Sequence, residues 1–245
     1  MRERPTEILL NLTLALAAAT FAVVMVRREF ATPPPREAPT LGPPTYVSGW
    51  EALIDSSRAI GQSNARVQLV EFVDYECGFC RLFEATRDLL AQEYPGDVSV
   101  SFVHFPIPGH RFAKPAAIAA ECARDVGRFA QMHRALFQYQ DSLGLKPWTE
   151  MALEAGVGDT VGFQKCLKSD SASSRVDIDV DVARRLSVNA TPTLVVNGWK
   201  LPIPPDEVEL RGIARSVRAG TPWQPSGGGD TVLLGAAREV GKPRK

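Results

Sequence analysis

The sequence predicts an α/β domain in which a long helical block is inserted between strands. First, the apolar run Val67–Val73 leads directly into a C-x-x-C and an amphipathic segment. Second, residues 98–103 alternate as a half-buried strand does. Third, the helical pattern of residues 113–186 gives way to an apolar run, Thr193–Val196, and the turn pair Asn197-Gly198. The expected order is strand, helix, strand, helical block, hairpin and helix.

Composition narrows the range of functions. The chain has 245 residues, with 28 Lys and Arg against 28 Asp and Glu, so its formal net charge is zero. Nucleic acid is therefore not an expected partner. Four cysteines are too few for a disulfide-dense scaffold, and only one pair is close enough in sequence to suggest zinc. We expect no metal site and no cofactor.

The N-terminal segment, residues 1–30, is predicted to be a signal anchor that forms one transmembrane helix. Residues 8–26 are apolar apart from Asn11, Thr13 and Thr20. At ~1.5 Å per residue they reach about 29 Å, close to the ~30 Å hydrocarbon core of a bilayer. A cleaved signal peptide is the alternative. The charges on the two sides of the segment do not decide its orientation.

The remaining boundaries follow from composition. Residues 31–47 are rich in proline and are predicted to be an extended linker. The folded domain is expected to span residues 48–219 and to end in a helix at 205–218. Residues 220–245 include Ser226-Gly227-Gly228-Gly229 and a basic end, so we expect a flexible C-terminal tail.

The C-x-x-C motif, Cys77-Gly78-Phe79-Cys80, stands between the first strand and a helix expected over Gly78–Glu93. Cys77 is thus placed at the helix N-terminus, where unpaired N–H groups and the helix dipole stabilise a thiolate. We predict that Cys77 is a nucleophile and that Cys80 is the more buried, resolving thiol. Haem attachment would need histidine after the second cysteine, where Arg81 stands instead.

The C-x-x-C, the distant Thr191-Pro192 before a strand and the helical block together resemble the DsbA-like branch of the thioredoxin superfamily. The resemblance covers residues 48–219 and implies a thioredoxin-like fold with a helical insertion at about 113–186. It also implies that Glu71, six residues before Cys77, is a buried acid that shuttles the proton of Cys80. A strand-end glutamate that faces water is the alternative.

The same resemblance assigns residues to substrate binding. Pro192 is similar to the cis-proline that faces the C-x-x-C in this superfamily, and Thr191 before it would pair with an extended substrate. A trans proline is the alternative. Gly78 and Phe79 would contact the substrate and tune the cysteines. Strongly oxidising DsbA proteins can have histidine at the position of Phe79, so we expect a less acidic Cys77 here.

Two further cysteines, Cys122 and Cys166, lie in the helical block. Paired cysteines in these contexts recur in DsbA-like proteins, so the resemblance implies a structural disulfide. Two buried free thiols are the alternative. The histidines His104, His110 and His133 are interpreted as surface or packing residues.

These observations lead to one functional hypothesis and one competitor. The first is a membrane-anchored thiol–disulfide oxidoreductase on the extracytoplasmic side of the cell membrane, periplasmic or outer, because disulfide chemistry operates there. It would act on protein thiols or disulfides as an oxidase or isomerase rather than a general reductase, and a membrane redox partner would reset it. The competitor is a non-enzymatic, membrane-tethered binding module, or a carrier of a soft metal such as Cu(I), that uses the same groove.

Overall fold

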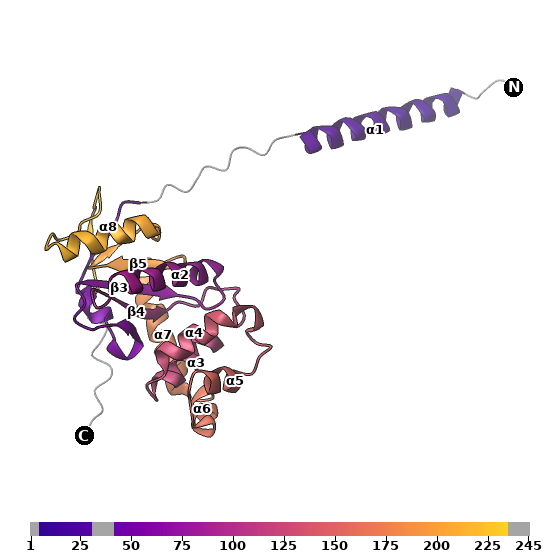
Figure 1. The fold of residues 1–245 in the computed structure, drawn as a ribbon. Coiled ribbons are helices and arrows are strands. Elements are labelled where there is room, and N and C mark those ends of the chain that lie inside the picture. The colour runs from indigo at the N-terminus through magenta and orange to yellow at the C-terminus, as the bar shows by residue number, and fades with distance from the viewer. Residues whose placement is uncertain (1–4, 31–41, 235–245) are drawn as a thin grey trace. The chain divides into compact units, whose positions relative to one another are not determined.

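The computed structural model describes residues 5–30 and 42–234, which belong to two units, Met1–Thr40 and Leu41–Lys245. In the first unit, helix α1 spans Pro5–Phe30 (Figure 1). Among the described residues, no helix is long and apolar enough to cross a membrane. The transmembrane helix therefore stays a prediction. Most of the predicted linker, residues 31–41, lies outside the described part of the chain.

Seven strands of the described second unit form one mixed sheet in the order β2–β4–β3–β5–β6–β1–β7. The central strand β3 pairs in parallel with β4 and antiparallel with β5. The strands are β1 (Thr45–Ser48), β2 (Ala59–Gly61), β3 (Val67–Val73), β4 (Val98–His104), β5 (Thr193–Val196), β6 (Trp199–Lys200) and β7 (Thr231–Leu233).

Helices cover both faces of this sheet. Two short 3-10 helices precede β2, and five helices with a third 3-10 turn fill the block between β4 and β5 (Figure 1). The elements are η1 (Trp50–Leu53), η2 (Ser56–Arg58), α2 (Gly78–Glu93), α3 (Ala113–Arg124), α4 (Phe129–Gln138), η3 (Gln140–Ser142), α5 (Trp148–Glu154), α6 (Thr160–Leu167), α7 (Asp170–Arg185) and α8 (Glu207–Arg218).

The period of two along β3 assigns its side chains to opposite faces. Leu69 and Val73 belong to the larger core, which also contains residues of α2, α4 and α8. Val70 and Phe72 belong to the second core, together with residues of α7. Glu71 alternates with Leu69 and Val73 and so shares their face, the face that carries the C-x-x-C helix.

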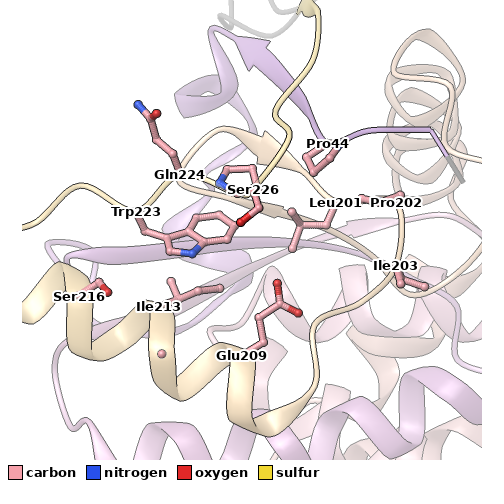
Figure 2. Close-up of a pocket in the computed structure, with 12 residues that line it drawn as sticks. Pro44, Leu201, Pro202, Ile203, Glu209, Ile213, Ser216, Trp223, Gln224 and Ser226 are labelled. Carbon is pink, nitrogen blue, oxygen red and sulfur yellow. The ribbon is translucent and has the colours of Figure 1, made fainter.

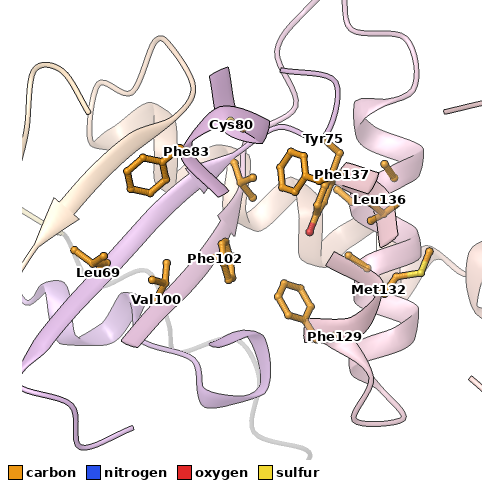
Figure 3. Close-up of a cluster of buried hydrophobic side chains, with 14 of the residues drawn as sticks. Leu69, Tyr75, Cys80, Phe83, Val100, Phe102, Phe129, Met132, Leu136 and Phe137 are labelled. Carbon is orange, nitrogen blue, oxygen red and sulfur yellow. The ribbon is translucent and has the colours of Figure 1, made fainter. Parts of the chain in front are cut away.

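The larger core continues to the active-site sulfur (Figure 3). Cys80 is buried among side chains of the sheet, of helices α2 and α4 and of the loop between β3 and α2. Figure 3 labels Leu69, Tyr75, Phe83, Val100, Phe102, Phe129, Met132, Leu136 and Phe137 among them. A close-packed apolar interior disfavours an ionised group. The second cysteine of the motif is therefore in an environment that favours a neutral thiol.

Two predicted boundaries need correction. Strand β1 begins at Thr45, inside the predicted linker, and pairs with β6. Strand β7 lies inside the predicted flexible tail and pairs in parallel with β1, so the prediction is wrong for residues 231–233. The pairing satisfies backbone groups of β1 that would otherwise form an open sheet edge. Residues 235–245 of the predicted tail lie outside the described residues.

Candidate active site

The two cysteines of the motif occupy different environments at the start of α2. Cys77 is the N-cap residue of the helix, and its N–H donates to the carbonyl oxygen of Asp74 at 3.1 Å. Its exposed fraction is 7%, whereas Cys80, one turn into the helix, is fully buried. Both are free thiols in this structure. The prediction that Cys80 is the more buried of the two is confirmed.

Hydrogen bonds stabilise the Cys77 thiolate. The Cys80 thiol lowers the pKa of Cys77 to about 5, against the opposing effect of partial burial, and the backbone N–H groups of Cys80 and Phe79 contribute. A free cysteine has a pKa of ~8.5, thioredoxin ~7 and DsbA ~3.5. With a pKa of about 5, Cys77 is mainly a thiolate at neutral pH.

Cys80 and Glu71 hold their protons instead. Burial raises the pKa of Cys80 far above its ordinary range, and the hydrogen bond to Cys77 adds to this effect. Burial also raises the pKa of Glu71 to about 8, although Arg87 acts in the opposite direction. Glu71 is 1% exposed, and its Oε2 has no hydrogen-bond partner among the described residues. A buried carboxyl that titrates near neutrality can exchange a proton with a buried thiol.

The tertiary structure brings Thr191 to the nucleophile from 114 residues along the chain. The Sγ of Cys77 lies 3.1 Å from the carbonyl oxygen of Thr191, to which its thiol form donates. The Thr191–Pro192 peptide bond is cis, and both residues are buried at the start of β5. Gly78 and Phe79 remain exposed, Phe79 with 73% of its surface. The site is a reactive sulfur between a buried backbone edge and an exposed aromatic side chain.

The other two cysteines lie in the helical insertion. Cys122 in α3 and Cys166 in α6 form a disulfide, the pairing that the resemblance implied. Cys122 is buried within the core. The bond joins two helices of the insertion.

Asp74 and Glu76, which lie in the loop before Cys77, and His110, which is bonded to Asp74, were not among the predicted site residues. Asp74 is buried, and its carboxylate accepts from the N–H of Glu76 at 2.7 Å, the N–H of Ile107 at 2.7 Å and Nδ1 of His110 at 2.8 Å. The available sequence signal was an acid three residues before the first cysteine. Nothing in the sequence paired it with His110.

Gln140 was also missed. Its Nε2 donates to the carbonyl oxygens of Tyr75 at 2.8 Å and of Cys77 at 3.0 Å. Gln140 lies in η3 and is buried, so the helical insertion holds the loop that carries the nucleophile. A single glutamine between helices offers no sequence signal for this role.

The histidines divide into two kinds. His133 is buried between the hydroxyl of Tyr75 at 3.0 Å and Oε2 of Glu84 at 2.9 Å. His104 is buried beside Glu121, with Nε2 3.2 Å from Oε1. The packing interpretation is confirmed for these two. His110 differs, because its partner Asp74 belongs to the loop before Cys77.

A separate pocket of about 590 Å³ lies against α8 (Figure 2). Ile213 of α8, Leu201 and Trp223 line it, and neither Cys77 nor Cys80 does. No cluster of three or more His, Cys, Asp or Glu side chains that could hold a metal occurs among the described residues.

Comparison with known proteins agrees with this geometry. A family model described as Thioredoxin matches residues 54–213. The chain belongs to the thioredoxin family. It resembles a thioredoxin-like oxidoreductase from Silicibacter pomeroyi, with a TM-score of 0.57 and 25% identity over 70% of this chain and 98% of that chain. It also resembles DsbA2 of Pseudomonas aeruginosa, with a TM-score of 0.54 and 26% identity over 67% of this chain and 94% of that chain. These likenesses place its fold in the DsbA-like branch of the family.

Curated relatives match over part of their length only. A protein named Na(+)/H(+) antiporter NhaA 1 from Mycolicibacterium gilvum is 34% identical over 163 residues, which are 65% of this chain and 26% of the relative. An antiporter NhaA 3 from Salinispora tropica is 34% identical over 178 residues, 71% of this chain and 26% of the relative. The chain spans about a quarter of the length of these relatives.

Proposed function

We propose that this chain exchanges disulfides with protein substrates through the Cys77–Cys80 pair. The observation that carries the proposal is the contrast between two neighbouring sulfurs: an acidic Cys77 at a helix N-terminus and a buried Cys80 that keeps its proton. Thiol–disulfide exchange needs an attacking or leaving thiolate at the surface and a second thiol that resolves the mixed disulfide. The two environments match these two requirements.

In the oxidising direction, a substrate thiolate attacks Sγ of Cys77 in the Cys77–Cys80 disulfide. The S–S bond breaks, Cys80 leaves with the electron pair, and Glu71 supplies the proton that its buried thiolate needs. A second substrate thiolate then attacks the substrate sulfur of the mixed disulfide, and Cys77 leaves as a stable thiolate. The substrate loses two electrons and the enzyme gains them. In the reverse direction, Glu71 accepts the proton of Cys80.

The acidity of Cys77 favours the oxidising or isomerising direction. A stabilised thiolate stabilises the reduced enzyme, which makes its disulfide a stronger oxidant. Phe79 cannot supply the positive charge that a histidine would supply at that position. We therefore expect a reduction potential between ~−270 mV, the value of thioredoxin, and ~−120 mV, the value of DsbA.

The proposal places the enzyme outside the cytoplasm, tethered to the membrane by residues 1–30, with a membrane redox partner that resets the pair. The support is the apolar sequence of residues 8–26 and the Cys122–Cys166 disulfide, because structural disulfides persist in oxidising compartments. Protein substrates would pair with the backbone edge at Thr191 and contact Gly78 and Phe79.

The test measures the reduction potential of the Cys77–Cys80 pair and the exchange activity of two cysteine variants. The reduction potential is titrated in glutathione buffers with thiol trapping as readout. Cys77→Ser is expected to abolish exchange, whereas Cys80→Ser is expected to accumulate mixed disulfides with client proteins. The Arg66→Gln variant, which changes an exposed residue away from the motif, is the control. Full exchange by Cys77→Ser would refute the proposal, and stoichiometric Cu(I) binding without exchange would favour a metal carrier.

A further inference from the structure

Two acidic side chains occupy the turn that leads into the nucleophile. Asp74 and Glu76 lie three residues and one residue before Cys77. Negative charges near a sulfur disfavour its thiolate, so this arrangement by itself opposes the acidity of Cys77. Oε2 of Glu76 accepts from the backbone N–H groups of Phe112 and Ala113 at the start of α3. The positive end of a helix thus compensates one of the two charges.

Asp74 is compensated differently. Besides two backbone N–H groups, its buried carboxylate binds Nδ1 of His110 at 2.8 Å, while the His110 side chain is 35% exposed. A carboxylate on one ring nitrogen favours the imidazolium form of histidine. The pair therefore joins a buried negative charge to a positive charge near the surface.

This pair is attached to the turn that leads into the reacting sulfur. The N–H of Cys77 donates to the carbonyl oxygen of Asp74 and closes a turn, whose first and last Cα atoms lie within ~7 Å of each other. Against the opposing effect of burial, Asp74, Glu76 and the Cys77 thiolate raise the pKa of His110. The neighbouring cation, Arg111, instead lies over the Phe112 ring at 5.2 Å.

We propose that His110, held by Asp74, is a positioning residue for thiol–disulfide exchange whose positive charge stabilises the Cys77 thiolate. It offsets the Asp74 charge beside the sulfur and supplies the electrostatic effect that Phe79 cannot supply inside the motif. The inference rests on the proposed function for its biological use, but its effect on Cys77 is a property of the reduced enzyme alone. Its test therefore needs no substrate protein.

The experiment compares the wild-type full-length chain with His110→Gln, with the conservative variant His110→Lys and with the control Arg111→Gln. Alkylation of reduced Cys77 by iodoacetamide is followed from pH 3 to pH 9, with the Cys122–Cys166 disulfide intact. In His110→Gln the titration midpoint of Cys77 is expected to rise by roughly one pH unit, the order of shift that one nearby opposite charge produces when solvent partly screens it. Alkylation at pH 5 then falls roughly five-fold. In Arg111→Gln the midpoint stays in place.

The pH profile separates a charge effect from a structural one. Stabilisation of the thiolate requires an ionised Cys77 and a protonated His110, so it operates from about pH 5 up to the raised pKa of His110. In that window His110→Gln is expected to lower the reduction potential by ~30 mV, the equivalent of a tenfold change. At higher pH the two proteins converge. His110→Lys keeps a charge and should retain the low midpoint and extend the window to higher pH.

Three results would contradict a charge effect of His110 on Cys77. An unchanged Cys77 midpoint in folded His110→Gln, or an equal rise in Arg111→Gln, refutes it. Failure of His110→Lys to restore the midpoint also counts against a charge effect. If the midpoint shifts as expected but the enzyme exchanges no disulfides with proteins, the proposed function fails and the role of His110 remains.

Discussion

At the residue scale, the burial of Glu71 couples the site to stability. The carboxyl has a pKa of about 8 in the folded chain, above its ordinary value of 4.5, because it lies in the apolar core. Between these values the unfolded chain releases a proton that the folded chain retains. The free energy of unfolding therefore falls as pH rises through this window. Above the folded-state pKa the contribution becomes constant.

The substitution Glu71→Gln removes this titrating carboxyl. Relative to the wild type, the variant should gain free energy of unfolding between pH 4.5 and pH 8, at ~1.4 kcal/mol per pH unit and up to roughly 4 kcal/mol. Urea unfolding at several pH values measures the effect. Exchange should slow in the same variant because Cys80 loses its proton partner. Parallel stability curves for the two proteins would show that Glu71 is solvated, contrary to the structure.

At the element scale, the disulfide between α3 and α6 is expected to stabilise the insertion. Its cysteines are separated by 44 residues. In the chain-entropy treatment a loop of this size contributes about 4 kcal/mol. The double variant Cys122→Ala, Cys166→Ala should lose about that much in urea unfolding.

The same double variant, Cys122→Ala with Cys166→Ala, also tests whether the disulfide affects the reduction potential of the active-site pair. Because the disulfide joins α3 to α6 and involves neither Cys77 nor Cys80, the double variant should keep the reduction potential of the C-x-x-C pair under conditions where it is folded. Gln140, in contrast, connects the insertion to the active-site loop through two backbone carbonyls. A change in potential in the double variant would mean that strain reaches the loop through η3.

At the scale of the whole molecule, the chain divides at residue 40, and every site residue lies in the unit Leu41–Lys245. A chain that lacks residues 1–40 should therefore fold and keep the reduction potential of the intact protein. If residues 1–30 are the proposed tether, it should also move from the membrane to the soluble fraction. Cell fractionation with thiol trapping measures both properties. Soluble full-length protein would reject the tether and leave the exchange chemistry intact.

Local sequence signals were sufficient to predict those elements of the fold that depend on neighbouring residues. The strand Val67–Val73, the helix Gly78–Glu93 and the Asn197-Gly198 turn were predicted because periodicity and turn chemistry act over a few residues. The C-x-x-C between strand and helix likewise predicted that Cys77 stands at a helix N-terminus. Strands β1 and β7 were not predicted, because their pairing satisfies backbone groups at a sheet edge and depends little on their own short sequences.

The sequence by itself therefore determined the fold class, the place of the C-x-x-C at a helix N-terminus and which of its two cysteines is the more buried. Only the tertiary structure placed the carbonyl of Thr191 at 3.1 Å from Cys77, bound Asp74 to His110, and buried Glu71 deeply enough to raise its pKa to about 8. The physical reason is the separation along the chain over which each effect acts. Propensity and helix-terminus electrostatics are properties of adjacent residues, whereas desolvation and charge compensation arise from groups that meet only after folding.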